Sequence, residues 1–272
     1  MLMRESRPPH WKPTLLIRAS LVLHVAALML FIVVPAQWRW TLGAVVLDHM
    51  LLMALGLWPR SHGLGPNWTR LPAAAAARNE IALTIDDGPD PDVTPQVLDL
   101  LDRHAIRATF FCIGEKAAQH PDVCREIVRR GHAVENHSQR HCHNFSLHGY
   151  AGFLREVQAA QETLTTITGQ PPLFFRAPAG LRNPFLDPVL TRLKLRLASW
   201  STRAFDTRTG NAERVKSKLL RDLQAGAILL LHDGNAARTS EGIPVIIDVV
   251  PAIAATAKAA GLRCVTLREA LS

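Results

Sequence analysis

The chain has 272 residues, of which 48% are hydrophobic and 20% charged, and its formal net charge is +8 with a pI near 9.9. That length accommodates one domain of ordinary size plus an appendage. The Lys and Arg residues are scattered rather than gathered into a dense run, which argues against nucleic-acid binding and suits a membrane surface or a phosphate-bearing partner.

Two apolar runs dominate the first 60 residues. The first covers residues 19–36 and the second 41–58, and the aromatic and basic turn Gln37-Trp38-Arg39-Trp40 separates them. A helix that crosses a bilayer needs about 20 apolar residues, and Trp favours the membrane interface. Residues 1–60 are therefore predicted to form a membrane anchor of two hydrophobic helices.

Each apolar run leaves an alternative open. The first could be a cleaved signal peptide, but the absence of a well-placed small-x-small cleavage site favours an uncleaved anchor. The second contains Asp48 and His49 near its middle, so it could be a second span, a re-entrant segment or a helix on the membrane face. With two spans the positive-inside rule puts both chain ends in the cytoplasm, whereas one span puts the following domain outside. We expect an inner (plasma) membrane protein and favour the cytoplasmic face for its catalytic domain.

A linker is expected over residues 61–78, and residues 79–272 then alternate between short apolar and longer amphipathic segments. Strands are predicted at 81–85, 108–113, 133–135, 173–176, 195–200, 227–232 and 263–266, and helices at 94–104, 121–130, 149–168, 184–193, 212–224 and 245–260. This order predicts an α/β domain of parallel strands with functional residues at the strand ends. The four cysteines have no C-x-x-C spacing and are predicted to be free thiols.

Asp86 and Asp87 follow the first predicted strand and precede Gly88-Pro89. Adjacent carboxylates repel each other unless a cation or proton lies between them. The pair is therefore a candidate metal site, although an Asp that caps the next helix would give the same pattern.

His137 and His141 form the second candidate cluster. Histidines at i and i+4 share a face if the segment is helical, and both can then bind one ion. One carboxylate and two imidazoles would leave open positions for water, as in a catalytic rather than a structural zinc site. A polar surface loop with incidental histidines is the alternative.

Arg176 and His232 each end an apolar strand. A buried Arg needs a carboxylate partner, so Arg176 belongs either to the site or to a structural ion pair. His232 follows the run Ile228-Leu229-Leu230-Leu231 at the end where α/β folds carry their functional groups, but a lone His there could equally be structural.

Taken in order, these clusters resemble the polysaccharide deacetylases (NodB-homology, carbohydrate esterase family 4). The resemblance covers roughly residues 80–271. Thr84-Ile85-Asp86-Asp87-Gly88-Pro89 is similar to the family's T-F-D-D-G-P element, and His137-Ser138-Gln139-Arg140-His141 to its H-[ST]-x-x-H element. Arg176-Ala177-Pro178 matches R-x-P, and Leu230-Leu231-His232 matches L-x-H. The resemblance implies a distorted (β/α) barrel of the NodB-homology type, here preceded by an N-terminal hydrophobic helical hairpin.

The resemblance also implies a metal-dependent hydrolase. Asp87, His137 and His141 would bind a divalent metal, commonly zinc, with cobalt, manganese and nickel as alternatives. Asp86 would be the general base toward the attacking water, since a carboxylate that is not a ligand stays free to take a proton. Arg176 would orient Asp86.

Further site residues follow from the same resemblance. His232 would protonate the departing amine, and Asp206 would hold that histidine charged. The backbone N–H of Ala179, after Pro178, would stabilise the oxyanion. Trp200 could stack on a sugar face or belong to the core.

The implied substrate is an N-acylated amino sugar, with acetyl as the expected acyl group, in a polysaccharide or a lipid-linked glycan. Because the anchor would hold the domain at the bilayer, we favour a lipid-linked sugar as substrate and expect the lipid bilayer as a partner. Nucleic acid is not expected as a partner. Ala179 and Thr207 stand where the family often has aromatic residues, so an O-acetyl esterase or a non-sugar amidase remains an alternative. A catalytically silent binding module is another, although no motif residue is missing.

Overall fold

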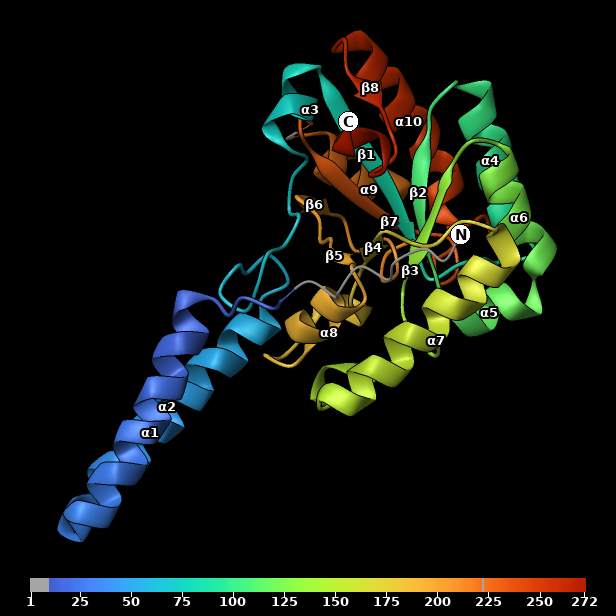
Figure 1. Cartoon of the computed structure of the whole chain (residues 1–272). Coiled ribbons are helices and arrows are strands. Elements are labelled where there is room, and N and C mark those ends of the chain that lie inside the picture. Colours follow the sequence, from blue (N-terminus) through green and yellow to red (C-terminus); the bar gives the residue numbers. More distant parts are fainter. Residues whose placement is uncertain (1–9, 222) are drawn as a thin grey trace.

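The computed structural model describes residues 10–221 and 223–272. The basic residues at positions 1–9 and residue 222 of the predicted helix 212–224 lie outside this part. The described chain consists of a helical hairpin followed by an α/β domain, and Figure 1 shows the hairpin projecting from one end of that domain.

The α/β domain is built on a curled sheet of parallel strands. Its order is β5-β4-β3-β2-β1-β7-β6, and β8 pairs with β1 beside this path. The central strand β1 (Glu80–Asp86) is fully buried, and it pairs with β2 (Ala108–Cys112) and β7 (Ile228–His232). The other strands are β3 (Ala133–Asn136), β4 (Phe174–Phe175), β5 (Arg196–Leu197), β6 (Thr202–Arg203) and β8 (Arg263–Cys264). This confirms the expected fold class of a distorted parallel (β/α) barrel.

Amphipathic helices cover the outside of the sheet, because each has one apolar face to bury. The helices are α4 (Val93–Arg103), α5 (Gly114–Gln119), α6 (Pro121–Arg129), α7 (Tyr150–Thr168), α8 (Leu186–Arg192), α9 (Ala212–Leu220) and α10 (Val245–Ala259). The largest core cluster packs α4, α6, α9 and α10 against β1, β2 and β7. Cys112, Cys124, Cys142 and Cys264 are all free, as predicted.

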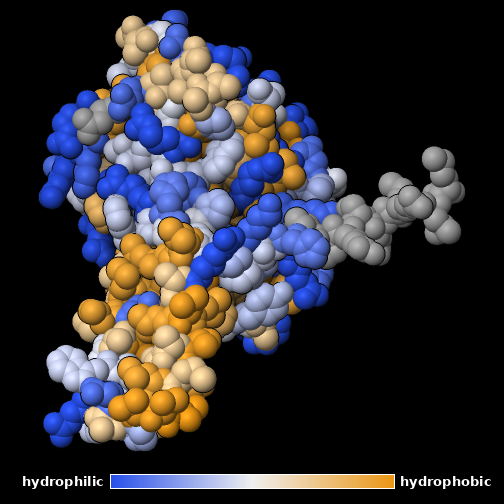
Figure 2. Space-filling view, turned by 60° about the vertical axis from the view of Figure 1, so that its left-hand side comes forward, coloured by the Kyte–Doolittle hydropathy of each residue, from blue (hydrophilic) through white to orange (hydrophobic). Residues whose placement is uncertain are grey.

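The hairpin consists of α1 (Leu15–Val33), a 3-10 turn (Pro35–Gln37) and α2 (Trp38–Leu57). The stretches Leu15–Val33 and Pro35–Leu57 are each long and apolar enough to cross a membrane. Figure 2 shows hydrophobic side chains over most of the projection, apart from its far tip. Most large apolar side chains of both helices are exposed, and an apolar surface of this size marks a site that meets a membrane or another protein.

The charged residue of α2 lies between the two helices. Ser20 Oγ donates to Asp48 Oδ2 at 2.7 Å, and His24 Nδ1 lies 3.8 Å from the same oxygen. Asp48 is buried. A carboxylate that faces the partner helix and accepts a hydrogen bond there is tolerated within an apolar hairpin, which explains a charge near the middle of this run.

The base of the hairpin is hydrogen-bonded to the α/β domain. Arg182 N donates to Gly56 O at 3.1 Å, and Ser199 Oγ donates to Pro59 O at 2.6 Å. Gly180 has a φ of +74°, and a Cβ there would lie 2.6 Å from both the Pro59 ring and the Trp200 indole. The chain therefore passes from α2 into the domain in close contact with the carboxyl ends of the strands.

The segment predicted as a linker, 61–78, lies against the domain. Trp68 forms a parallel bridge with Ala198, and the segment ends in α3 (Ala73–Ala77). Leu64, Leu71 and Ala75 are buried. The helices α3 and α5 and the strand β6 were not among the predicted elements.

Candidate active site

The carboxyl ends of the strands surround a pocket of about 210 Å³. Parallel α/β folds carry their reactive groups at this end because every strand delivers its following loop there. The ladder pairs Asp86 directly with His232 across β1 and β7. The lining consists of Asp86, Asp87, His137, His141, Ala179, Gly180, Trp200, Arg203, Thr207, Leu230, His232 and Asn235.

Asp87, His137 and His141 converge on one point. The Nε2 atoms of both histidines lie 3.2 Å from Asp87 Oδ1, and the three ligand atoms lie within 4.8 Å of one another. His137 Nδ1 lies 2.8 Å from the carbonyl oxygen of Arg176, so this nitrogen carries the proton and donates it. Its Nε2 then presents a lone pair to a carboxylate oxygen, an arrangement that a cation between them would stabilise.

The ionisation of these groups suits metal binding. Burial and the neighbouring His137 lower the pKa of His141 to about 4, so its imidazole is neutral near pH 7. Burial would raise the pKa of Asp87, but the three histidines around it outweigh burial and lower this pKa well below its usual range. Ligands must be a neutral imidazole and an ionised carboxylate, so the residues fit a divalent ion.

The histidines converge by a different route from the predicted one. Residues 137–141 form a loop after β3, not a helix, and Ser138 and His141 have φ values of +65° and +52°. Ser138 N donates to Asn136 Oδ1, and His141 N donates to Ser138 Oγ, both at 3.0 Å. These bonds hold the left-handed backbone that turns both rings toward Asp87, whose own φ is +72°.

Asp86 lies beside this triad but faces Arg176. Arg176 Nη1 donates to Asp86 Oδ1 at 2.6 Å and to Thr84 Oγ1 at 2.8 Å. The other carboxylate oxygen, Oδ2, lies 3.8 Å from His137 Nε2. Asp86 and Arg176 are 3% and 0% exposed, so the guanidinium fixes the orientation of a carboxylate whose free oxygen borders the pocket.

His232 ends β7, on the other side of β1 from β3, and is held by Asp206. Asp206 Oδ1 accepts from His232 Nδ1 at 3.0 Å, and Oδ2 accepts from the His232 backbone N–H at 2.7 Å. This leaves Nε2 of His232 for the pocket. Burial lowers the pKa of His232, but Asp206 together with Asp86 and Asp87 outweighs burial and raises it.

The segment after β4 contributes backbone and aromatic groups. Pro178, Ala179 and Gly180 form a 3-10 turn in which Ala179 has a φ of +54°. Ala179 and Trp200 line the pocket, whereas Pro178 is buried within the turn and does not line it. The indole of Trp200 is 7% exposed and packs in the core cluster with Phe111 and Phe174, so it belongs to the core and to the pocket wall at once.

Three residues of the site were given no role from the sequence, although Thr84 lies within the first motif. Asn235 Nδ2 donates to Asp87 Oδ2 at 2.9 Å, Thr84 joins Arg176, and Arg203 lines the pocket. Asn235 follows β7 by three residues, so the rule that groups gather after strand ends could have found it.

Comparison with known proteins agrees with this geometry. Residues 73–198 match the family model described as polysaccharide deacetylase. The chain is 37% identical over 167 residues to a chitooligosaccharide deacetylase of Azorhizobium caulinodans, which covers 60% of this chain and 78% of that protein. The chain belongs to the polysaccharide deacetylase family.

Another relative in sequence and a solved structure extend the likeness. A peptidoglycan-N-acetylglucosamine deacetylase of Bacillus cereus is 30% identical over 191 residues, 69% of this chain and 66% of that protein. The crystal structure of the Bc1960 peptidoglycan N-acetylglucosamine deacetylase superposes with a TM-score of 0.67 at 28% identity, over 75% of this chain and 91% of that one. The family deacetylase domain is therefore matched in both sequence and fold.

Proposed function

We propose that the protein is a metal-dependent deacetylase that hydrolyses the N-acetyl group of an amino sugar at a membrane surface. The observation that carries the proposal is the convergence of His137 and His141 on Asp87, with Asp86 beside them. Relatives named for peptidoglycan N-acetylglucosamine and for chitooligosaccharides support an N-acetylated amino sugar as the substrate class.

Asp87, His137 and His141 would hold the metal. Two imidazoles and one carboxylate suit zinc, with cobalt, manganese or nickel as alternatives. When bound, such an ion supplies positive charge that acidifies water and polarises a carbonyl oxygen. Asn235 would steady Asp87 through its second carboxylate oxygen.

The two remaining ionisable groups divide the proton transfers. Asp86, oriented by Arg176, would take a proton from the water that attacks the acetyl carbon. His232, oriented by Asp206, would give a proton to the sugar nitrogen as the carbon–nitrogen bond breaks. The water's oxygen and the acetyl group leave as acetate, and the sugar keeps a free amine.

The turn after β4 would stabilise the negative charge that develops on the carbonyl oxygen. The backbone N–H of Ala179 borders the pocket, and a donor there would stabilise the oxyanion of the tetrahedral intermediate. Trp200 on the pocket wall would contact the sugar. Ala179 and Thr207 are small, which leaves the pocket wider than aromatic residues would.

The anchor would bring this site to the bilayer. Residues 1–60 would form the membrane anchor, 61–78 the connection and 79–272 the catalytic domain. The contacts of Gly56 and Pro59 with the domain support a strand-end face turned toward the membrane. A lipid-linked glycan in the inner membrane, reached from the cytoplasmic face, suits this arrangement better than a distant polymer.

The test measures acetate release by the full chain in nanodiscs, after metal removal and after reloading with zinc. Substrates are N-acetylglucosamine oligomers, a lipid-linked N-acetylglucosamine, an O-acetylated sugar and a simple N-acetyl amide. We expect zinc-dependent release from the N-acetylated sugars. Release from the ester or the simple amide alone, or release that survives metal removal, would contradict the proposal.

A further inference from the structure

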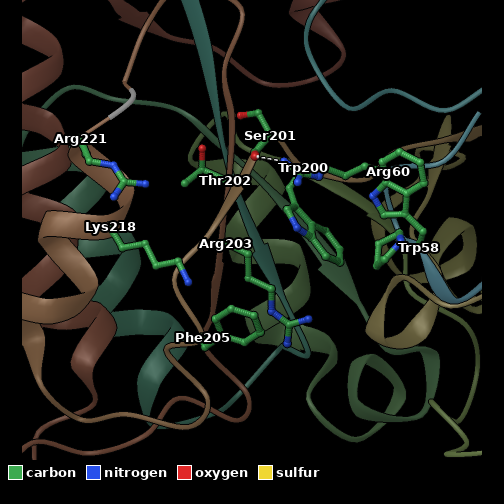
Figure 3. A pocket seen from close by; sticks show the side chains of 10 residues that line it. Trp58, Arg60, Trp200, Ser201, Thr202, Arg203, Phe205, Lys218 and Arg221 are labelled. Carbon is green, nitrogen blue, oxygen red and sulfur yellow. Dashed lines mark hydrogen bonds between the residues drawn. The ribbon is translucent and has the colours of Figure 1, made fainter.

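A second pocket adjoins the site on its membrane side. It has a volume of about 450 Å³ and lies between the end of α2, the segment from Trp200 to Phe205, and helix α9. Figure 3 shows Arg60 on one side of this pocket and Lys218 of α9 on the other, with Arg203 and Phe205 below. The pocket shares Trp200 and Arg203 with the active site, so the two pockets are direct neighbours.

The charge of this pocket has one sign. Among the described residues, the lining includes four cations and no carboxylate. Arg60, Arg203 and Lys218 form no ion pair in residues 10–221 and 223–272, although many other Arg side chains of the domain are paired. Cations held near one another without a carboxylate attract an anionic ligand.

Two of these cations lie over aromatic rings. The guanidinium of Arg203 lies 5.4 Å from the Trp200 ring centre and 5.1 Å from that of Phe205, and Lys218 Nζ lies 4.4 Å above Phe205. Arg203 Nε is buried and has no hydrogen-bond partner. These ring contacts restrict where the Arg203 guanidinium can lie, and a guanidinium pairs with phosphate through its fork of N–H donors.

The location links this pocket to the bilayer as well as to the active site. Trp58, directly after the last residue of α2, lines the pocket and is 55% exposed. Arg60 follows it and donates to the carbonyl oxygen of Ser201 at 3.1 Å. Exposed Trp at the end of an apolar helix favours the membrane interface, where lipid phosphates lie.

We infer that this pocket binds the phosphate that joins a membrane lipid to an N-acetylated amino sugar, while the sugar occupies the neighbouring active site. The inference rests on the proposed function and names its substrate class as a phosphate-linked glycolipid. The lipid chain would leave past Trp58 along the hairpin, and Arg60, Arg203 and Lys218 would contact the phosphate oxygens.

The test compares two probes that differ only in the phosphate. In the first probe, N-acetylglucosamine is joined at C1 to a dodecyl chain through a phosphodiester, and the second is the plain dodecyl glycoside. Binding is measured by calorimetry with the full-length Asp86→Asn protein in phosphatidylcholine nanodiscs, so that turnover does not interfere. We expect at least about tenfold tighter binding of the phosphodiester, because each charge-assisted hydrogen bond contributes about that factor.

Variants test whether the preference for the phosphodiester probe comes from this pocket. Arg60→Gln combined with Lys218→Gln should remove most of it, whereas Lys258→Gln, which removes an exposed cation of α10, should keep it. Equal binding of the two probes, or an unchanged preference in the double variant, would overturn the inference. If phosphatidylglycerol added to the nanodisc abolishes the preference for the phosphodiester probe, the pocket recognises bulk lipid headgroups, and the inference also falls.

Acetate release by the wild-type chain separates this inference from the proposed function. Selective phosphodiester binding without release from either probe would overturn the deacetylase activity and leave the phosphate site standing. Release from both probes at equal kcat/KM, without selective binding, would overturn the phosphate site and leave the deacetylase standing.

Discussion

Arg176 Nη1 lies 2.6 Å from Asp86 Oδ1, and the two side chains come from positions 90 residues apart. The same guanidinium donates to Thr84 Oγ1 and to the carbonyl oxygens of Ala198 and Ser199, at 2.7–3.1 Å. One fully buried side chain thus connects the end of β1 to the segment after β5. It orients the proposed general base and also holds the strand ends together.

Arg176→Gln should therefore lose stability as well as activity. Removing one partner of a buried ion pair costs about 3–5 kcal/mol, because the remaining charge is left without compensation. We expect a matching fall in the free energy of unfolding, measured by denaturant titration. Arg192→Gln, an exposed change on α8, is the control and should stay within about 0.5 kcal/mol of the wild type. Comparable stability of the two variants would contradict the role given to Arg176.

Asn235→Ala should weaken metal binding without removing a ligand. Asn235 Nδ2 donates to Asp87 Oδ2, and loss of such a partner typically lowers metal affinity about 10- to 100-fold. Zinc affinity is measured by competition with a chelator. Asn144→Ala is the control, since Asn144 is exposed on the same side of the fold and makes no side-chain cap bond. Unchanged affinity in Asn235→Ala would show that Asp87 needs no such support.

Asp206→Asn should change the pH dependence of turnover. His232 has a raised pKa because Asp206 and the site carboxylates outweigh burial. A proton donor stays active below its pKa, so turnover falls as pH rises through the raised value. Removing the Asp206 charge lowers that pKa, and the alkaline limb of kcat should move to lower pH, with a fall in kcat of about 10²-fold or more. An alkaline limb that stays in place would exclude His232 as the proton donor.

Gly180→Ala tests the contact between the hairpin and the active site. A Cβ at Gly180 would overlap Pro59 and Trp200, and the φ of +74° adds backbone strain. Gly169→Ala is a close control because Gly169 has a φ of +71° and nothing within 4 Å of the added carbon. Overpacking costs about 1–3 kcal/mol, so Gly180→Ala should have the lower thermal midpoint and faster protease cleavage between residues 59 and 72. Equal midpoints would contradict the close packing at the hairpin base.

Much of the α/β domain could be predicted because its strands are apolar and its helices amphipathic. Buried strands such as 81–85 and 227–232 end at polar residues, and parallel connectivity brings those ends together. The short elements could not be predicted in this way. Helix α5 has six residues and β6 has two, too few for a periodic pattern, and α3 is a run of alanines without polar alternation.

The candidate residues could be named from the sequence, but their geometry could not. Helical spacing predicted that His137 and His141 converge, but the segment is not a helix. Their rings turn inward because the backbone at Ser138 and His141 is left-handed. Such conformations are imposed by contacts that are distant in sequence, and no local propensity predicts them. The cationic pocket was missed for the same reason, because Arg60, Arg203 and Lys218 are scattered along the chain and gather only in the fold.

The central claim is that adjacent carboxylates have different tasks, with Asp87 a metal ligand and Asp86 a base held by Arg176. Zinc content and zinc-dependent acetate release of Asp86→Asn and Asp87→Asn, measured side by side with exposed Asp92→Asn as the control, test this claim most directly. We expect Asp86→Asn to keep its zinc and lose turnover, Asp87→Asn to lose both, and the control to keep both. An active Asp86→Asn protein, or an Asp87→Asn protein that binds zinc as tightly as the wild type, would contradict the account.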